Sequence, residues 1–275
     1  MTFTKQCISS DRAEREARRL QQVQGRGVVP LHGSAASRLT LAEAACSLAD
    51  VVHHRRTLPE AEVRAVGAAA AAALARVHEA GLVHGDVKPA NLLLSHDGEL
   101  WLADFDATAT ADGRPLQRHS PPRAAPGAPA RFATDVAALA VTLTELATGV
   151  LIDPAALWRA GDLRRLGCSA VLSAELSFML QSAAAHDGDA SSLTARDAAG
   201  MLAAGSGSLP ATVRQVSAAD STPTVDFTLS RPLARAAHET ARRASAPTAT
   251  ATPGWWRRCV RGLAAALLPA KHGAR

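Results

Sequence analysis

Three polar side chains lie at the ends of two short apolar runs in the segment HGDVKPANLLLSHDGELWLADFD. The runs, residues 92–94 and 100–102, flank an Asp-Gly pair that suits a tight reversal, so we expect them to pair as a β-hairpin. Pairing brings Asn91, just before the first run, close to Asp104, just after the second. An amide oxygen and a carboxylate at one place suit Mg²⁺, which keeps waters and takes phosphates as further ligands. Asp86 would stand beside this site as a base or an orienting group.

This segment resembles the catalytic loop and the metal loop of protein kinases, which read H-R-D-x-x-x-x-N and D-F-G. The resemblance implies that Asp86 accepts the proton of the substrate hydroxyl and that Lys88 steadies the transferred phosphoryl group. It also implies that Asn91 and Asp104 hold Mg²⁺ and, with it, ATP. A lysine two residues after the aspartate is typical of serine/threonine kinases. The expected partner is therefore a protein substrate with a Ser or Thr hydroxyl.

Three positions depart from the kinase pattern. Gly85 replaces the arginine of H-R-D, so a phosphate on the activation segment has no arginine partner there, and we do not expect switching by phosphorylation of that segment. Asp106 replaces the glycine of D-F-G and gives up backbone freedom after the metal ligand. Gly127 replaces the glutamate of the A-P-E motif that closes the activation segment in kinases.

Two other functions stay open at this point. Asp106, Gly127 and the lack of a glycine-rich loop before the catalytic segment favour a pseudokinase that acts as a binding scaffold. H-G-D and D-F-D are common in aminoglycoside and choline phosphotransferases, which favours a small-molecule phosphotransferase. The run TDVAALAVTLTELATG weighs against the latter, because it resembles a helix of protein kinases. Thr134 and Asp135 are expected to cap this helix, and the resemblance implies that Asp135 hydrogen-bonds the catalytic-loop backbone.

The N-terminal residues resemble part of the small kinase lobe. Residues 2–5 are similar to the end of the strand that carries the ATP-binding lysine, and Glu16 lies in a charged helical stretch over residues 11–22. The resemblance implies that Lys5 holds the α- and β-phosphates and pairs with Glu16. A flexible terminal lysine is the alternative. No G-x-G-x-x-G precedes Lys5, so either the phosphate lid is missing or the start codon was placed too late, and we favour the second.

The next stretch is expected to complete the small lobe and to lead into the nucleotide site. Residues 28–31 and 38–42 are predicted strands, of which the first contains a proline that favours an edge strand or an irregular one. By the resemblance, the hinge that follows them runs from Glu43 to Ala45 and hydrogen-bonds adenine through its backbone. Leu93, in the first strand of the hairpin, is assigned to the same nucleotide site.

Helical periodicity dominates the middle of the chain. Apolar residues recur at helical spacing over residues 58–80, with a glycine at the end that suits a C-cap. The expected fold is α+β: a protein kinase-like bilobal fold with an incomplete small N-lobe sheet and a mainly helical C-lobe. The predicted divisions are residues 1–45 for a partial N-lobe, 46–205 for the C-lobe, 206–254 for a disordered Ala/Ser/Thr/Pro linker, and 255–275 for a basic amphipathic segment.

Composition bounds the remaining possibilities. The chain has 275 residues, 47% of them hydrophobic, and a formal charge of +5. No nucleic-acid-binding motif accompanies that charge, so nucleic acid is not an expected partner. Four scattered cysteines, the absence of a signal-peptide pattern and the absence of a long apolar run predict a cytoplasmic protein. Residues 255–275 could contact the inner face of the membrane or dock on a protein. The sequence does not indicate an oligomeric state.

Overall fold

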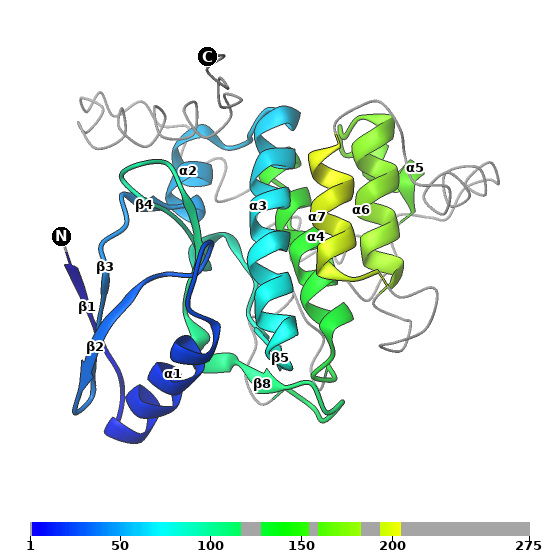
Figure 1. Ribbon diagram of the computed structural model, residues 1–275. Coiled ribbons are helices and arrows are strands. Elements are labelled where there is room, and N and C mark those ends of the chain that lie inside the picture. The colour runs from blue at the N-terminus through cyan, green and yellow to red at the C-terminus, as the bar shows by residue number, and fades with distance from the viewer. Residues whose placement is uncertain (1, 117–127, 154–158, 183–192, 205–275) are drawn as a thin grey trace, which may run out of the picture.

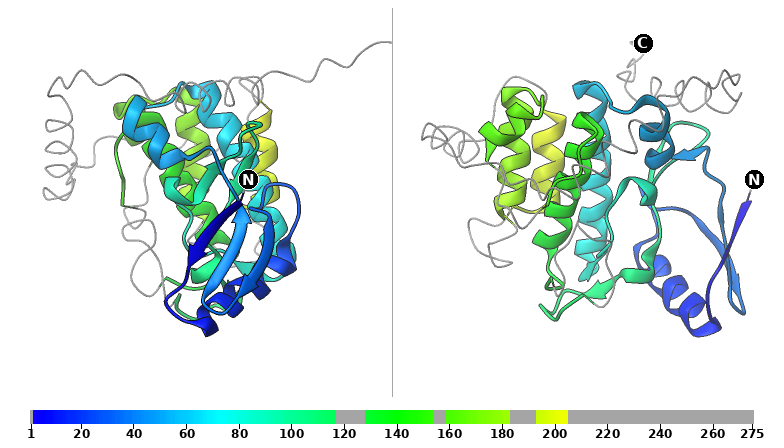
Figure 2. Two further views of the ribbon diagram at one scale, coloured as in Figure 1. Left: turned by 90° about the vertical axis from the view of Figure 1, so that its left-hand side faces the viewer. Right: turned by 180° about the vertical axis from the view of Figure 1, so that it is seen from behind.

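The computed structural model describes residues 2–116, 128–153, 159–182 and 193–204. A small sheet with one helix lies on one side of the molecule and a group of helices lies on the other, with a hairpin between them (Figure 1). The view from behind shows the same division (Figure 2). The α+β fold, with a small sheet and a mainly helical second part, is thus confirmed. The predicted linker and the segment 255–275 lie outside the described residues.

The small lobe is built on the strands β1 (Thr2–Gln6), β2 (Leu31–Ala35) and β3 (Arg38–Ala42), in the antiparallel order β1-β3-β2. The helix α1 (Ser10–Val23) covers this sheet. Its buried apolar residues recur three or four positions apart, as expected for a helix with one face toward a core. They are Ala13, Ala17, Leu20 and Val23.

The strand expected at residues 28–31 is wrong in its position. The two valines of that stretch are buried and lie against the end of the hairpin: Val28 forms a parallel bridge with Leu102, and the amide of Val29 donates to the Leu102 carbonyl at 3.0 Å. The β2 strand begins only after Pro30. Burial of the valines against the hairpin draws them away from the sheet, and the more exposed residues 31–35 form the edge strand instead.

The predicted hairpin is present and lies between the two lobes. Its strands are β6 (Leu92–Leu94) and β7 (Leu100–Leu102), and β6 pairs on its other side with β4 (Cys46–Ser47). Leu92 is opposite Leu102 and Leu94 is opposite Leu100. Gly98 in the reversal has φ +84°, a left-handed conformation that glycine adopts without strain. This register places the residues before β6 and after β7 side by side.

The large lobe is a group of packed helices. The chain passes from α2 (Leu48–Arg55) to α3 (Glu60–Glu79), α4 (Phe132–Thr148), α5 (Ala160–Arg165), α6 (Ala170–Ser182) and α7 (Ala195–Ala203). The predicted stripe of α3 is buried, and Gly67 lies within it. A Cβ at Gly67 would come within 2.8 Å of the side chains of Leu143 and Leu202. A small residue at this position therefore lets α3, α4 and α7 pack closely.

A buried ion pair joins the helices of the large lobe. Arg64 of α3 donates to both carboxylate oxygens of Glu175 in α6, at 2.5 and 2.7 Å, and to the carbonyl of Met201 in α7 at 3.5 Å. Burial raises the pKa of Glu175, although the guanidinium beside it acts in the opposite direction. Among the described residues, no helix is long and apolar enough to cross a membrane. The three cysteines that the structure describes form no disulfide with one another: Cys7, Cys46 and Cys168.

Candidate active site

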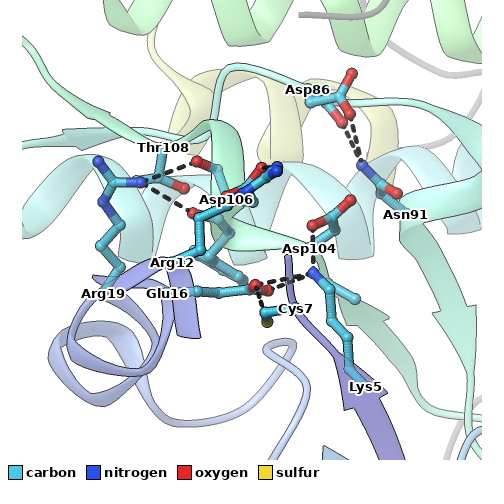
Figure 3. A network of polar contacts seen from close by, with 12 residues as sticks. Lys5, Cys7, Arg12, Glu16, Arg19, Asp86, Asn91, Asp104, Asp106 and Thr108 are labelled. Carbon is cyan, nitrogen blue, oxygen red and sulfur yellow. Dashed lines mark hydrogen bonds and ion pairs between the residues drawn. The ribbon is translucent and has the colours of Figure 1, made fainter. Parts of the chain in front are cut away.

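Lys5 lies at the centre of a cluster of charges between the two lobes. Its Nζ lies 2.7 and 2.9 Å from the two carboxylate oxygens of Glu16 in α1, and 2.6 Å from Oδ1 of Asp104 (Figure 3). The strand β1 supplies the lysine, and the residue after the hairpin supplies the aspartate. The alternative of a flexible terminal lysine is contradicted, because Lys5 is paired inside β1 opposite Leu39 and is held by two carboxylates.

Charge and burial act against each other in this cluster. Burial alone would lower the pKa of Lys5, but the carboxylates of Asp104 and Glu16 outweigh it and raise that pKa above the ordinary value. Burial raises the pKa of Glu16, and the ammonium of Lys5 only partly opposes this. The cationic form of Lys5 is thus stabilised by two carboxylates at once. A lysine held in this way is a suitable group to meet phosphate oxygens.

Asp104 adopts an unusual backbone conformation at the end of β7. Its φ of 65° and ψ of 73° are left-handed, a region that Asp and Asn enter more readily than most residues. The turn η2 (Phe105–Ala107) follows at once. The amide of Ala103 donates to the carbonyl of Asn91 at 2.9 Å, so the chain before Asp104 is tied to the mouth of β6. The carboxylate of Asp104 remains 39% exposed, which leaves it accessible to a ligand.

Asp86, Lys88 and Asn91 form a second polar group beside the first. The amide nitrogen of Asn91 donates to the carbonyl of Asp86 at 2.8 Å and to its Oδ2 at 3.2 Å. The Nζ of Lys88 lies 2.5 Å from the same Oδ2. The turn η1 (Pro89–Asn91) connects this loop to β6 and sets the direction of Asn91. Figure 3 shows Asp86 joined to Asn91, and Asp104, in the same region, joined to Lys5.

Asp135 of α4 holds the catalytic loop by accepting hydrogen bonds from two of its backbone amides. Its Oδ2 accepts from the amide of His84 at 2.7 Å, and its Oδ1 accepts from the amide of Gly85 at 2.9 Å. Oδ2 also lies 2.9 Å from Nε2 of His78. The predicted contact of Asp135 with the catalytic-loop backbone is confirmed. The expectation that Thr134 and Asp135 cap this helix is wrong, because α4 starts at Phe132 and both residues lie inside its first turns.

His84 is fully buried between the catalytic loop and the residues that follow β7. Its Nδ1 accepts from the amide of Asp86 at 3.3 Å, and its Nε2 lies 3.1 Å from the carbonyl of Ala103. This pattern requires a proton on Nε2 only, and hence a neutral imidazole. Burial lowers the pKa of His84 in agreement, although Asp135 acts in the opposite direction. The ring packs edge-on against Phe105, with centroids 4.9 Å apart.

Gly85 stands where the H-R-D motif has arginine, and its backbone conformation and close neighbours explain why a glycine suits this position. Its φ is +81°, and a Cβ there would lie 3.0 Å from the carbonyl oxygen of Ala107 and 3.3 Å from the side chain of Leu116. A side chain at Gly85 would therefore be strained and would push against η2. Asp106, by contrast, is not among the residues with positive φ, so its position does not require a glycine.

The oxygen atoms at this site suit Mg²⁺ bound together with phosphates. Asn91 donates through its amide nitrogen toward Asp86, so its side-chain oxygen is the atom that could face a cation. Asp104 adds an accessible carboxylate. Within the described ranges, no three His, Cys, Asp or Glu residues come together as a metal site. Two protein oxygens completed by waters and phosphates are the arrangement that Mg²⁺ favours over an all-protein site.

The residues assigned to the hinge lie in the connection between β3 and β4. Glu43 and Ala45 are both partly buried there, and the amide of Ala45 donates to the carbonyl of Leu94 at 2.7 Å. Leu93 of β6 is opposite Ser47 of β4, so it lies near this connection. The structure thus groups the three predicted adenine-site residues around the β4–β6 pair, and their contact with a nucleotide stays a prediction.

Two arginines at the site were missed from the sequence. Arg12 of α1 binds the carboxylate of Asp106, and Arg19 donates to the carbonyls of Phe105 and Asp106 at 3.3 and 3.0 Å. A signal for them was present, because Arg12 precedes Glu16 by four residues and Arg19 follows it by three. Residues at these spacings share one face of a helix.

Comparisons with known proteins agree with this geometry. Residues 3–155 match the family model of the protein kinase domain. A serine/threonine-protein kinase F of Synechocystis is 38% identical over 113 residues, which cover 37% of this chain and 23% of that protein. A 3-phosphoinositide-dependent protein kinase 1 of Arabidopsis thaliana is 30% identical over 153 residues, covering 47% of this chain and 31% of that protein.

A probable serine/threonine-protein kinase of Clostridium perfringens is 28% identical over 114 residues, which cover 38% of this chain and 17% of that protein. The matched segments thus span less than a third of each of these relatives. The family model nevertheless covers more than half of the 275 residues, together with Lys5, Glu16, Asp86, Asn91 and Asp104. This chain belongs to the protein kinase family.

Proposed function

We propose that this protein is a serine/threonine protein kinase that transfers the γ-phosphoryl group of Mg-ATP to a protein hydroxyl. The observation that carries the proposal is the position of Lys5, which bridges Glu16 of α1 and Asp104 after β7. In protein kinases this lysine–glutamate pair and the metal-binding aspartate must both be in place for phosphoryl transfer. Two consecutive elements, β1 and α1, supply Lys5 and Glu16, and Asp104 joins them from 99 positions away along the chain.

On this proposal, Lys5 binds the α- and β-phosphates, and Glu16 keeps its ammonium group in position. Asn91 and Asp104 hold Mg²⁺, which supplies positive charge against the charge that develops on the phosphates. The contact between Lys5 and Asp104 is compatible with these roles, because both side chains are partly exposed and can turn toward a ligand. Glu43, Ala45 and Leu93 line the adenine end of the site.

Asp86 is the proposed base for the substrate hydroxyl. Asn91 and Lys88 both contact its Oδ2, which restricts the orientation of the carboxylate. Asp135 holds the backbone of the preceding two residues, so the loop that carries Asp86 has little freedom to move away. Lys88 lies close enough to Asp86 to meet the phosphoryl group as it passes to the hydroxyl. This lysine also supports a Ser or Thr hydroxyl as the acceptor.

The test is transfer of labelled phosphate from ATP to a mixed protein substrate in the presence of Mg²⁺. We expect Asp86→Asn to lower the rate by roughly 10²- to 10⁴-fold, the range for loss of a general base. Asp97→Asn, in the exposed reversal of the hairpin, is the matched control and should keep the wild-type rate. Equal rates for wild type and Asp86→Asn would contradict the assignment of Asp86.

The two alternative functions predict different results. A pseudokinase scaffold would be stabilised by Mg-ATP in a thermal shift assay but would transfer no phosphate to protein. A small-molecule phosphotransferase would label an aminoglycoside or choline in place of protein. Asp106 no longer supports the scaffold, because its backbone conformation does not call for glycine. Gly127, the other residue that suggested it, lies outside the described residues.

A further inference from the structure

One face of α1 carries three charged residues that face the site: Glu16 contacts Lys5, and two arginines contact the residues after β7. Arg12, Glu16 and Arg19 are spaced by four and three positions and so form a single stripe along the helix. Glu16 contacts Lys5, whereas Arg12 and Arg19 reach the turn η2 (Figure 3). The resemblance to protein kinases assigned a role to Glu16 but none to the two arginines.

Arg12 binds Asp106 with both ends of its guanidinium group. Its Nε donates to Oδ1 at 2.7 Å, and its Nη2 donates to Oδ2. The two side chains are only 22% and 20% exposed. Bidentate arginine–carboxylate pairs are stronger and more directional than single contacts, and partial burial limits screening by salt. Asp106 is the residue that departs from D-F-G, and Arg12 is therefore its matching partner on α1.

Arg19 adds a second connection about two turns further along α1. It donates to the carbonyls of Phe105 and Asp106, which belong to the backbone of η2. Hydrogen bonds to backbone carbonyls restrain the main chain of the turn itself, whereas an ion pair restrains only a side chain. The turn is thus held by α1 at the Asp106 carboxylate and at two of its own carbonyls.

These contacts close a ring of ion pairs around the site. Lys5 contacts Glu16 and Asp104, Glu16 and Arg12 share α1, and Arg12 contacts Asp106, two residues after Asp104. The ring borders a cavity of about 160 Å³ that is also lined by Gln6, Cys7 and Ile8. Because Glu16 and Arg12 lie on the same helix, a movement of α1 away from residues 104–106 would act on both ion pairs. The two ion pairs therefore favour the same orientation of the helix.

We propose that Arg12 and Asp106 are a positioning pair that holds α1 against the metal loop, residues 104–106, and so keeps Glu16 on Lys5 and Asp104 beside Asn91. This rests on the proposed kinase function. The pair needs no phosphate and no arginine beside the catalytic aspartate, in keeping with Gly85. The chain thus holds α1, which carries Glu16, in place through its own charged residues, without modification of the activation segment.

The test is a double-mutant cycle of Arg12→Gln, Asp106→Asn and the two together, in the full chain. For each variant, kcat and the KM for ATP are measured with Mg²⁺ and a protein substrate. We expect each single change to lower kcat by roughly ten-fold or more, and the double variant to be no slower than the slower single one, since coupled residues are not additive. Arg18→Gln is the matched control, because Arg18 lies on the same helix, pairs with Glu14 and is 68% exposed.

Hydrogen–deuterium exchange of the same variants without nucleotide gives a measurement that does not depend on activity. We expect faster exchange in residues 104–108 and in α1 for Arg12→Gln and Asp106→Asn, and no change for Arg18→Gln. Unchanged exchange in the two variants, or losses in kcat that simply multiply, would overturn the positioning pair. If exchange rises as expected while the wild-type protein transfers no phosphate, the pair stands and the proposed kinase activity fails.

Discussion

The two lobes each hold a basic side chain between elements that are far apart in the sequence, but the settings differ. Lys5 in the small lobe is 26% exposed and meets one buried and one accessible carboxylate. Arg64 in the large lobe is 9% exposed and meets Glu175, which is 2% exposed. The first cluster lies where a ligand can reach it and the second lies inside a helical core.

This difference in exposure determines whether each ion pair can open to bind a ligand. Both Lys5 and Asp104 are partly exposed. Lys5 can therefore leave Asp104 to bind ligand oxygens, and Asp104 can leave Lys5 to bind a metal ion. Arg64 and Glu175 have no such freedom. Separating a buried pair leaves an uncompensated charge in a medium that solvates it poorly. The large lobe thus uses charge to fix how its helices pack, whereas the small lobe uses it at a site that accepts ligands.

The largest expected effect comes from breaking the buried pair. We expect Glu175→Ala to lower the free energy of unfolding by about 3–5 kcal/mol, because Arg64 is left buried with only the more distant Glu60, at 3.8 Å, to offset its charge. Urea denaturation measures this directly. Glu79→Ala is the matched control: Glu79 also lies on α3 and pairs with Arg196 of α7, but the side chains are 57% and 78% exposed. That change should cost less than about 1 kcal/mol.

The same comparison can be sharpened by removing both partners. The double variant Arg64→Met with Glu175→Leu should recover most of the lost stability, since apolar residues of similar size can replace a buried pair. A loss in the double variant as large as in Glu175→Ala would mean that volume, and not charge, accounts for the effect.

The exposed cluster should respond in the opposite way, with little loss of stability and a loss of ligand binding. Asp104→Asn keeps the left-handed backbone, which Asn tolerates, and leaves Lys5 paired with Glu16. Wild-type protein at 100 times the Kd of Mg-ATP should gain about 2.7 kcal/mol of stability. We expect the variant to lose most of that gain in a thermal shift assay. If Mg-ATP stabilises wild type and Asp104→Asn equally, the metal assignment is wrong.

The smallest effect concerns pH and the loop between the two lobes. The pKa of His84 is lowered by burial from 6.5, so the folded state favours the neutral ring. The unfolded chain binds the extra proton first, and stability is therefore full above about pH 6.5 and falls as the pH drops toward the pKa of the folded state. The carboxylates of Asp135, Asp86 and Asp104 oppose this shift and limit its size.

Unfolding free energies at about pH 7 and about pH 5 check this prediction. The difference between the two should be smaller in His84→Gln, which lacks the titrating ring. The control His96→Asn, at the exposed end of the hairpin, should behave as wild type. An equal pH dependence in wild type and His84→Gln would show that another group is responsible.

Much of the fold follows from local patterns. The buried stripe of α3 and the hairpin around Gly98 were predicted because helical periodicity and an Asp-Gly reversal act over a few residues. The wrong strand at residues 28–31 shows the limit of that reasoning. Two valines beside a proline look like an edge strand, but they are drawn to Leu102, more than 70 positions away along the chain. No local signal reports such a contact.

The candidate site divides in the same way. The sequence motifs pointed to Asp86, Asn91 and Asp104, because these residues flank one hairpin and the pairing of its strands brings them close together. The ion pair between Arg12 and Asp106 joins residues 94 positions apart, and Arg64 and Glu175 are 111 apart. Each of these pairs depends on how helices and loops pack against one another, which a list of charged residues does not specify.

By itself, the sequence determined the family, the catalytic loop and the helices, since these depend on residue types at short and regular separations. Only the tertiary structure decided that α1 lies against residues 104–106 and that the carbonyl of Ala107 leaves no room for a side chain at Gly85. It also decided which charges are accessible and which are buried. The physical reason is that the strength of a charge pair depends on its exposure to water, and exposure is set by the packing of distant segments.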